Sequence, residues 1–178
     1  MSVKKLALAA IGLFAGYKFY RASNPQIPEN VVPVTGFDLS RYLGKWYEVG
    51  RVDNRFERGL IKTTAEYTLN GDGTVNVLNS GVDANSGRHK RASGTAVFVR
   101  SQNEGALKVS FFGPFYGGYN VVALDEDYQW SIVAGSSPQY FWVLSRSAEM
   151  SEDLKDRAFK VAREVGIAPD QINWVQQI

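Results

Sequence analysis

The chain has 178 residues, a formal net charge of +2, 44% hydrophobic residues and 13% aromatic residues. This length suits one domain with a hydrophobic core, and this composition is typical of a globular protein rather than a disordered one. The chain contains no cysteine and only one histidine, His89, which excludes disulfides and thiol nucleophiles and argues against a zinc site. The small net charge does not indicate nucleic-acid binding.

The first residues have the pattern of a targeting segment. Lys4 and Lys5 precede the apolar run 6–16, which has the length of a signal-peptide core and is short for an ideal membrane-spanning helix. Small residues do not occupy both cleavage positions, so an uncleaved anchor is the preferred interpretation of residues 1–22. A signal peptide cleaved at an atypical site and a plain apolar N-terminus are the alternatives. We expect residues 23–36 to form a linker and residues 37–178 to form the domain.

From residue 44 to residue 145 the chain alternates short β-type runs with turn signals. The runs are residues 46–52, 63–69, 74–82, 92–100, 106–112, 119–124, 129–134 and 140–145. Residues 70–73, Asn-Gly-Asp-Gly, are a strong hairpin turn, and the glycine-rich residues 113–118 are expected to form a loop. Eight sequential strands with hairpin-length links predict an antiparallel up-and-down barrel without exposed edges.

Helical periodicity appears only after these strands. Ser151 is a suitable N-cap, and acidic residues follow it in the first turn. An apolar stripe at helical spacing continues to Val165, and Gly166 ends the helix. Residues 172–175 are expected to form a last strand. The predicted fold is therefore all-β, an eight-stranded antiparallel up-and-down β-barrel with one C-terminal α-helix packed outside it and a short ninth strand.

Four motifs follow one another along the predicted strands. They are Gly-Lys-Trp-Tyr-Glu at 44–48, Arg-Phe-Glu-Arg-Gly-Leu at 55–60, the run 108–121 around Phe-Phe-Gly-Pro-Phe-Tyr-Gly-Gly, and Leu-Ser-Arg at 144–146. In this order they resemble the lipocalin family, and within it the bacterial lipocalins, which are outer-membrane lipoproteins. The resemblance covers about residues 36–178. It departs from the family at 124–128, which replaces a Thr-Asp-Tyr motif, and at Tyr17, which stands where the lipid-modified cysteine would be.

The resemblance implies a binding function rather than an enzymatic one. It implies that the barrel stores or transports a fatty acid or lysophospholipid for maintenance of the cell envelope, on the periplasmic side and associated with a membrane surface. That membrane is the outer one by resemblance, and an inner-membrane anchor is the alternative because the cysteine is absent. It also allows for a homodimer, and it implies no cofactor, metal or nucleic-acid partner. By analogy, Trp46 closes the base of the barrel and Arg146 stacks on its ring, a contact worth about 0.5–2 kcal/mol.

The alternation of side chains along each strand selects the residues that face the ligand. Eight strands enclose just enough space for one small ligand. The predicted ligand-binding residues are Glu48, Gly50, Phe56, Tyr67, Ala96, Phe98, Val109, Phe111, Tyr119, Val121, Trp142 and Leu144. A solid core without a cavity is the alternative. A phase error of one residue would exchange the inward and outward sets of a strand.

The hairpin order divides the loops between a mouth and a base. The mouth loops carry more cations than anions, namely Arg51, Arg55, Arg58, Lys62, Arg88, Lys90 and Arg91 against Asp53, Glu57 and Asp83. The base loops carry the opposite excess, namely Arg100 against Asp72, Glu104, Asp125, Glu126 and Asp127. We expect the basic mouth to attract anionic head groups or a phospholipid surface. Ordinary solvated loops are the alternative.

Two other function classes remain open at this point. An enzyme on the same barrel would need a cysteine, a histidine or a pair of carboxylates inside it, and the sequence places only Glu48 there. An interaction protein would use its mouth loops, especially residues 112–119, to dock a partner or a second copy.

Overall fold

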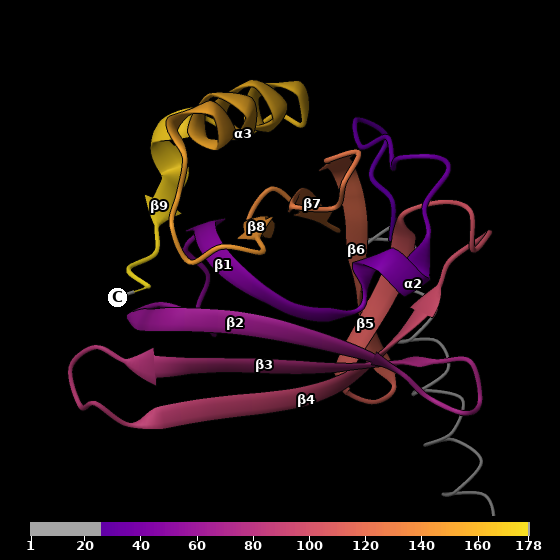
Figure 1. Ribbon diagram of the computed structural model, residues 1–178, viewed down its shortest axis with the longest axis horizontal. Coiled ribbons are helices and arrows are strands. Elements are labelled where there is room, and N and C mark those ends of the chain that lie inside the picture. The colour runs from indigo at the N-terminus through magenta and orange to yellow at the C-terminus, as the bar shows by residue number, and fades with distance from the viewer. Residues whose placement is uncertain (1–25, 178) are drawn as a thin grey trace, which may run out of the picture.

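The computed structural model describes residues 26–177. The predicted signal or anchor segment, residues 1–22, lies outside the described residues. Within them, nine antiparallel strands form one sheet in the order β2-β3-β4-β5-β6-β7-β8-β1-β9, and pairing of β1 with β2 closes the first eight into a barrel (Figure 1). The strands are β1 (Gly44–Val52), β2 (Leu60–Leu69), β3 (Val75–Asp83), β4 (His89–Phe98), β5 (Ala106–Phe112), β6 (Phe115–Leu124), β7 (Trp130–Gly135), β8 (Phe141–Ser145) and β9 (Ile172–Trp174). The predicted up-and-down barrel is confirmed.

The C-terminal helix packs on the outside of the barrel, as predicted (Figure 1). This helix, α3 (Glu152–Glu164), begins at Ser151, whose hydroxyl accepts a hydrogen bond from the Leu154 amide. Its buried residues Leu154, Ala158 and Ala162 join an outer cluster with the outward faces of β7 and β8. A 3-10 turn, η1 (Pro169–Gln171), then leads into β9, which pairs with the mouth half of β1.

A second, inner cluster lies within the barrel itself. It combines inward-facing residues of all eight barrel strands with residues of a short helix, α2 (Leu39–Tyr42), which lies across the base. Asp38 caps this helix by accepting a hydrogen bond from the Ser40 amide, and Tyr42, its last residue, is buried. The barrel therefore has a closed base and, at the other end, a mouth formed by residues 53–59, 84–88, 113–114 and 136–140.

The glycine-rich segment 113–118 is a strand over most of its length, so its expectation as a loop is wrong. β6 begins at Phe115, directly after a two-residue connection. A side chain at Gly118 would overlap the carbonyl oxygen of Gln26, because the segment leading into the domain lies flat against β6 there. The glycine thus marks a close approach of two backbones rather than a turn.

A bulge in β1 changes which side chains face the interior. The pairing of β1 with β8 slips between Glu48 and Gly50, so that Val49 and Gly50 both belong to the outer side. A Cβ atom at Gly50 would meet the Trp174 ring of β9 at 2.7 Å. The prediction that Gly50 faces the interior is therefore wrong, since strict alternation cannot be continued through a bulge. Arg51 points inward in its place.

Candidate functional site: the barrel interior and its mouth

The base of the barrel is closed by a contact between Trp46 and Arg146. The guanidinium carbon lies 3.8 Å from the centre of the indole, which is fully buried, so the predicted contact is confirmed. The guanidinium also donates to the backbone oxygens of Lys45, Arg41 and Leu43 at 2.7–2.9 Å. Because the last carbonyls of a helix have no partner within it, Arg146 also caps the C-terminal end of α2.

A column of aromatic rings runs from this base to the mouth. Ring centres are 4.9 Å apart for Trp46 and Tyr42, 5.5 Å for Tyr42 and Tyr67, 5.9 Å for Tyr67 and Tyr119, and 6.5 Å for Tyr119 and Trp142. The Tyr119 hydroxyl lies 2.8 Å from that of Tyr42 and 2.7 Å from that of Tyr67. Burial raises the pKa of Tyr42 to about 12, so this hydroxyl cluster is neutral at physiological pH. The interior is apolar along its wall and has an uncharged polar group near its centre.

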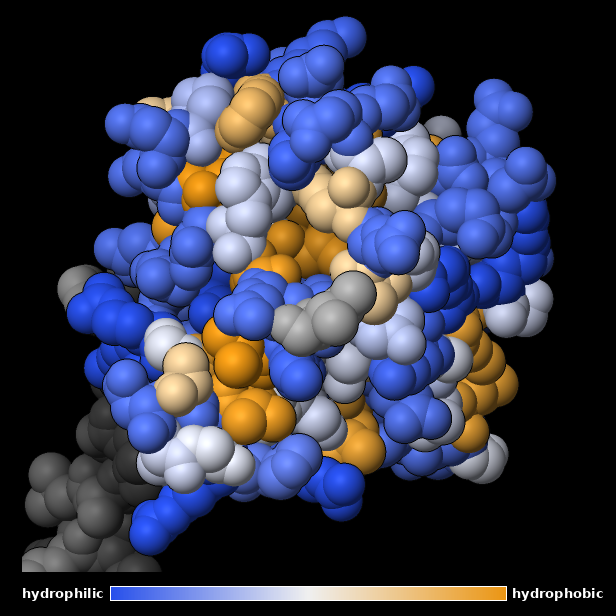
Figure 2. Space-filling model, turned by 60° about the vertical axis from the view of Figure 1, so that its left-hand side comes forward, coloured by the Kyte–Doolittle hydropathy of each residue, from blue (hydrophilic) through white to orange (hydrophobic). Residues whose placement is uncertain are grey.

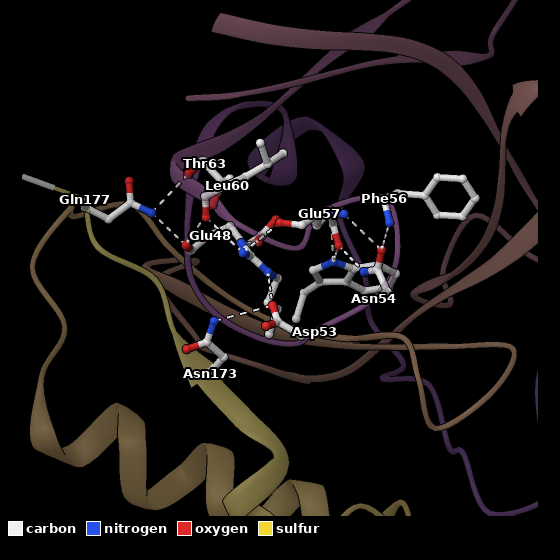
Figure 3. A network of polar contacts seen from close by, with 11 residues as sticks. Glu48, Asp53, Asn54, Phe56, Glu57, Leu60, Thr63, Asn173 and Gln177 are labelled. Atoms are coloured by element: carbon white, nitrogen blue, oxygen red, sulfur yellow. Dashed lines mark hydrogen bonds and ion pairs between the residues drawn. The ribbon is translucent and has the colours of Figure 1, made fainter. Parts of the chain in front are cut away.

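A buried ion pair joins Arg51 to Glu48 in the half of β1 that approaches the mouth (Figure 3). Arg51 is only 1% exposed, and its Nη1 atom lies 2.8 Å from Glu48 Oε1. Its Nε atom donates to Asp53, and its Nη2 atom donates to the backbone oxygens of Glu57 and Leu60, both at 2.9 Å. The guanidinium therefore ties both ends of the β1–β2 loop to the barrel interior. Its expectation as an exposed cation of the mouth is wrong, because the bulge in β1 turns it inward.

The same loop sends a second carboxylate into the mouth. Trp142 Nε1 donates to the Glu57 carboxylate, with distances of 3.1 Å to Oε2 and 3.3 Å to Oε1 (Figure 3). The side-chain amide of Asn54 donates to the same Oε2 atom. Asn54 Oδ1 in turn accepts from the backbone N–H of Phe56 at 2.9 Å. One asparagine therefore shapes the loop and holds Glu57 over the ring column.

Glu48, Glu57 and the Arg51 guanidinium lie close together, and the other two groups shift the pKa of Glu48. Burial raises the pKa of Glu48 above its ordinary value, the nearby Glu57 raises it further, and Arg51 opposes the shift. The cause that prevails is the loss of water around a side chain that is only 7% exposed. The mouth therefore holds a buried carboxyl group that binds a proton more readily than an exposed glutamate does.

The predicted ligand-binding residues divide by their positions. Most of them lie in the inner cluster, namely Tyr67, Ala96, Phe98, Val109, Tyr119, Val121, Trp142 and Leu144. Glu48 is buried beside Arg51, whereas Gly50 lies on the outer side. Phe56 is 61% exposed at the rim, with the Arg55 guanidinium 4.6 Å from its ring centre, and does not contribute to the interior.

Phe111 lines a surface depression in the barrel wall between β4 and β5. In the described chain β4 pairs with β5 only from Thr95 to Phe98, so the mouth half of β4 separates from its neighbour. A depression of about 310 Å³ opens there, lined by Ser93, Gly94, Thr95, Ser110, Phe111, Gly113 and Tyr116. A Cβ atom at Gly94 would meet the Phe111 ring at 2.8 Å, so the glycine makes room for this ring.

Sequence reasoning did not identify Asn54 and Tyr42, and it placed Arg51 wrongly. The spacing Asn54-x-x-Glu57 is a signal for a side-chain-capped turn and could have been recognised. Tyr42 precedes the first strand and gave no signal of its own, because a helix of four residues leaves little periodicity.

No helix within residues 26–177 is long and apolar enough to cross a membrane. In the same range, no group of three His, Asp or Glu side chains is arranged to hold a metal ion.

Comparison with known proteins agrees with this architecture. Residues 37–177 match the model of the lipocalin-like domain. The chain is 45% identical over 163 residues to the outer membrane lipoprotein Blc of Escherichia coli, covering 92% of each chain. It is 46% identical over 152 residues to the Blc protein of Vibrio cholerae, covering 85% of this chain and 89% of the relative. Temperature-induced lipocalin-1 of Arabidopsis thaliana is 35% identical over 142 residues, 75% of each chain.

Solved structures share the fold at lower identity. The cockroach allergen Per a 4 superposes with a TM-score of 0.64 at 25% identity and covers 83% of this chain and 92% of its own. Insecticyanin of the tobacco hornworm Manduca sexta superposes with a TM-score of 0.67 at 22% identity, covering 84% and 85%. The closed barrel, the Trp46–Arg146 contact and the family match together establish that the chain belongs to the lipocalin family, a family of non-enzymatic proteins that bind hydrophobic ligands.

Proposed function

We propose that this lipocalin binds a fatty acid or a lysophospholipid in its barrel and stores or transports it in maintenance of the bacterial cell envelope. The observation that carries the proposal is the inner cluster, in which apolar side chains of all eight barrel strands face one another above a closed base. Burying an acyl chain against such a wall contributes about 0.8 kcal/mol for each methylene group. Ala65 and Ala96 keep parts of the wall small, which favours a slender acyl chain over a bulky ring system.

Native mass spectrometry followed by lipid extraction tests this function directly. We expect a mass increment of one acyl lipid for each chain or each dimer, and recovery of that lipid in the extract. The matched variant is Ala96→Phe, which fills the interior at a residue that is 1% exposed. It should lose the increment while keeping a folded near-ultraviolet spectrum. A wild-type protein that remains empty with every acyl lipid offered would contradict the proposal.

We place the protein on the periplasmic side of the envelope, held at a membrane. The similarity to proteins named outer membrane lipoproteins supports this location. The chain has no cysteine to carry a lipid, so the apolar segment 6–16 is the candidate for attachment. Extraction of membranes with carbonate and with detergent, followed by detection of the protein in separated inner and outer membranes, tests both statements.

The rim of the mouth supports a role at a lipid surface. Phe112 is 79% exposed and Phe115 is 55% exposed, and with Phe56 they place three rings among the basic mouth loops. Figure 2 shows how apolar patches lie among hydrophilic side chains on one face of the molecule. Rings beside cations are typical of surfaces that contact anionic bilayers.

A homodimer stays a prediction. Sedimentation velocity with and without bound lipid measures it, and a single monomeric species under both conditions would contradict it.

A further inference from the structure

The carboxylate of Glu57 has an unusual position for a loop residue. Although Glu57 belongs to loop 53–59, its carboxylate points towards the mouth end of the aromatic column, where Trp142 Nε1 donates a hydrogen bond to it at 3.1 Å. Trp142 itself stacks on Tyr119 within the interior, at an angle of 25° between the rings. The Glu57 carboxylate thus lies at the boundary between the polar mouth and the apolar wall, which is where the head group of an inserted amphiphile would lie.

The groups that donate hydrogen bonds to Glu57 could equally donate to the acidic group of a bound ligand. Its two side-chain donors, the Trp142 indole and the Asn54 amide, are neutral N–H groups. Arg51, the nearby guanidinium, forms its ion pairs with Glu48 and Asp53 instead. Asn54 is a polar residue only 7% exposed, so its amide would lose its partner if the Glu57 side chain left and nothing replaced it.

We propose that the Trp142 indole N–H and the Asn54 amide form a seat for the acidic head group of the ligand, and that Glu57 occupies this seat until the ligand displaces its side chain. The proposal rests on the proposed function as an acyl-lipid binder. The shared chemistry of the head group is an anionic oxygen, from a carboxylate or a phosphate. The seat is filled by a carboxylate of the chain itself, so a long-chain carboxylic acid is the ligand it fits best.

The seat does not depend on the Glu57 side chain for its shape. Arg51 holds the loop through the backbone oxygens of Glu57 and Leu60, and Asn54 Oδ1 holds the backbone N–H of Phe56. None of these bonds uses the Glu57 carboxylate. Rotation of one side chain into the solvent therefore frees both donors while the loop keeps its path, and the ligand exchanges one carboxylate for another.

The test compares three lipids with the same chain, namely oleate, oleoyl lysophosphatidate and oleyl alcohol, on the full protein and on three variants. Glu57→Ala empties the seat and should bind oleate about tenfold more tightly, with oleyl alcohol changed less than twofold. Trp142→Phe keeps a ring but removes the donor, and should weaken oleate relative to oleyl alcohol. Glu126→Ala removes the same charge from an exposed position at the base and should leave both affinities unchanged.

The indole ¹H–¹⁵N resonance of Trp142, identified by its loss in Trp142→Phe, reports on the seat directly. It should move in Glu57→Ala and return towards the wild-type position with oleate but not with oleyl alcohol. Equal responses to the two lipids, or an oleate affinity unaffected by Glu57→Ala, would overturn the seat while leaving acyl-lipid binding intact. Failure of all three lipids to bind would contradict the proposed function, and the seat with it. A stronger response to lysophosphatidate than to oleate would identify the head group as phosphate and contradict the preference for a carboxylic acid.

Discussion

Among single residues, Glu48 should make the stability of the protein depend on pH in an uncommon direction. Burial raises its pKa in the folded chain above the ordinary value of 4.5, which it keeps in the unfolded chain. At pH values between the unfolded and the folded pKa, the folded chain therefore holds a proton that the unfolded chain has released. The free energy of unfolding therefore falls as the pH rises through this range, by up to about 1.4 kcal/mol per pH unit. Glu48→Gln keeps an acceptor for Arg51 and cannot titrate, so it should flatten this slope.

Urea unfolding of wild type and Glu48→Gln at several pH values from 4.5 upward measures the effect. Glu66→Gln is the matched control, since it removes an exposed carboxylate from the neighbouring strand. A slope that is the same in wild type and Glu48→Gln would show that this carboxyl group has the same acidity folded and unfolded.

Arg51 should be among the residues most costly to replace. At pH values above the raised pKa of Glu48, where its carboxyl group is ionised, Arg51→Met leaves this charge buried without its cation and frees the backbone oxygens of Glu57 and Leu60. We expect a loss of about 3–5 kcal/mol in the free energy of unfolding under these conditions. Arg55→Met changes an exposed arginine of the same loop and should cost less than about 0.5 kcal/mol. In the double variant Glu48→Gln, Arg51→Met the loss should be smaller than in Arg51→Met alone, because no buried charge is left unpaired. Chemical denaturation of the four proteins decides this.

Among the elements, β9 depends on the absence of a side chain in β1. In Gly50→Val the Cβ atom alone would come to 2.7 Å from the Trp174 ring, and the two methyl groups would overlap it. The substitution should therefore separate β9 from β1. Overpacking of this kind costs about 1–3 kcal/mol. Hydrogen exchange should speed up in residues 172–174 while the barrel strands keep their protection. Gly71→Ala, at a turn glycine with free space around it, should change neither quantity.

The elements also show how far the sequence could predict the fold. Hairpin turns, alternation and the Ser151 cap predicted eight strands, the helix and their order, because each is a local signal. The bulge at Val49 and the strand at Gly118 were missed, since each depends on a distant partner, β8 in one case and the segment at Gln26 in the other. For the same reason most of the interior was predicted correctly, while Gly50 and Arg51 exchanged sides and the seat around Asn54 was not foreseen.

Across the whole molecule, the ends of the barrel differ in charge, and this difference should orient it on a membrane. Arg88, Lys90 and Arg91 are exposed at the mouth, on the same end as the rings of Phe56 and Phe112. Lys90 is paired with Asp83 at 3.0 Å, which leaves the two arginines as the stronger attraction for anionic lipid. Each cation near such a surface contributes about 1 kcal/mol, and the contribution falls with salt.

Reversal of these three charges to glutamate should therefore weaken binding to phosphatidylglycerol-containing vesicles at least about tenfold at low salt. The matched control reverses Arg157, Lys160 and Arg163, which are exposed on α3 on the outside of the barrel and change the net charge equally. Cosedimentation with vesicles measures both. If the two triple variants bind equally well, net charge alone governs the attraction and the mouth has no special role in it. If only the mouth variant loses binding, the mouth faces the bilayer, and a lipid can pass between bilayer and barrel without crossing water.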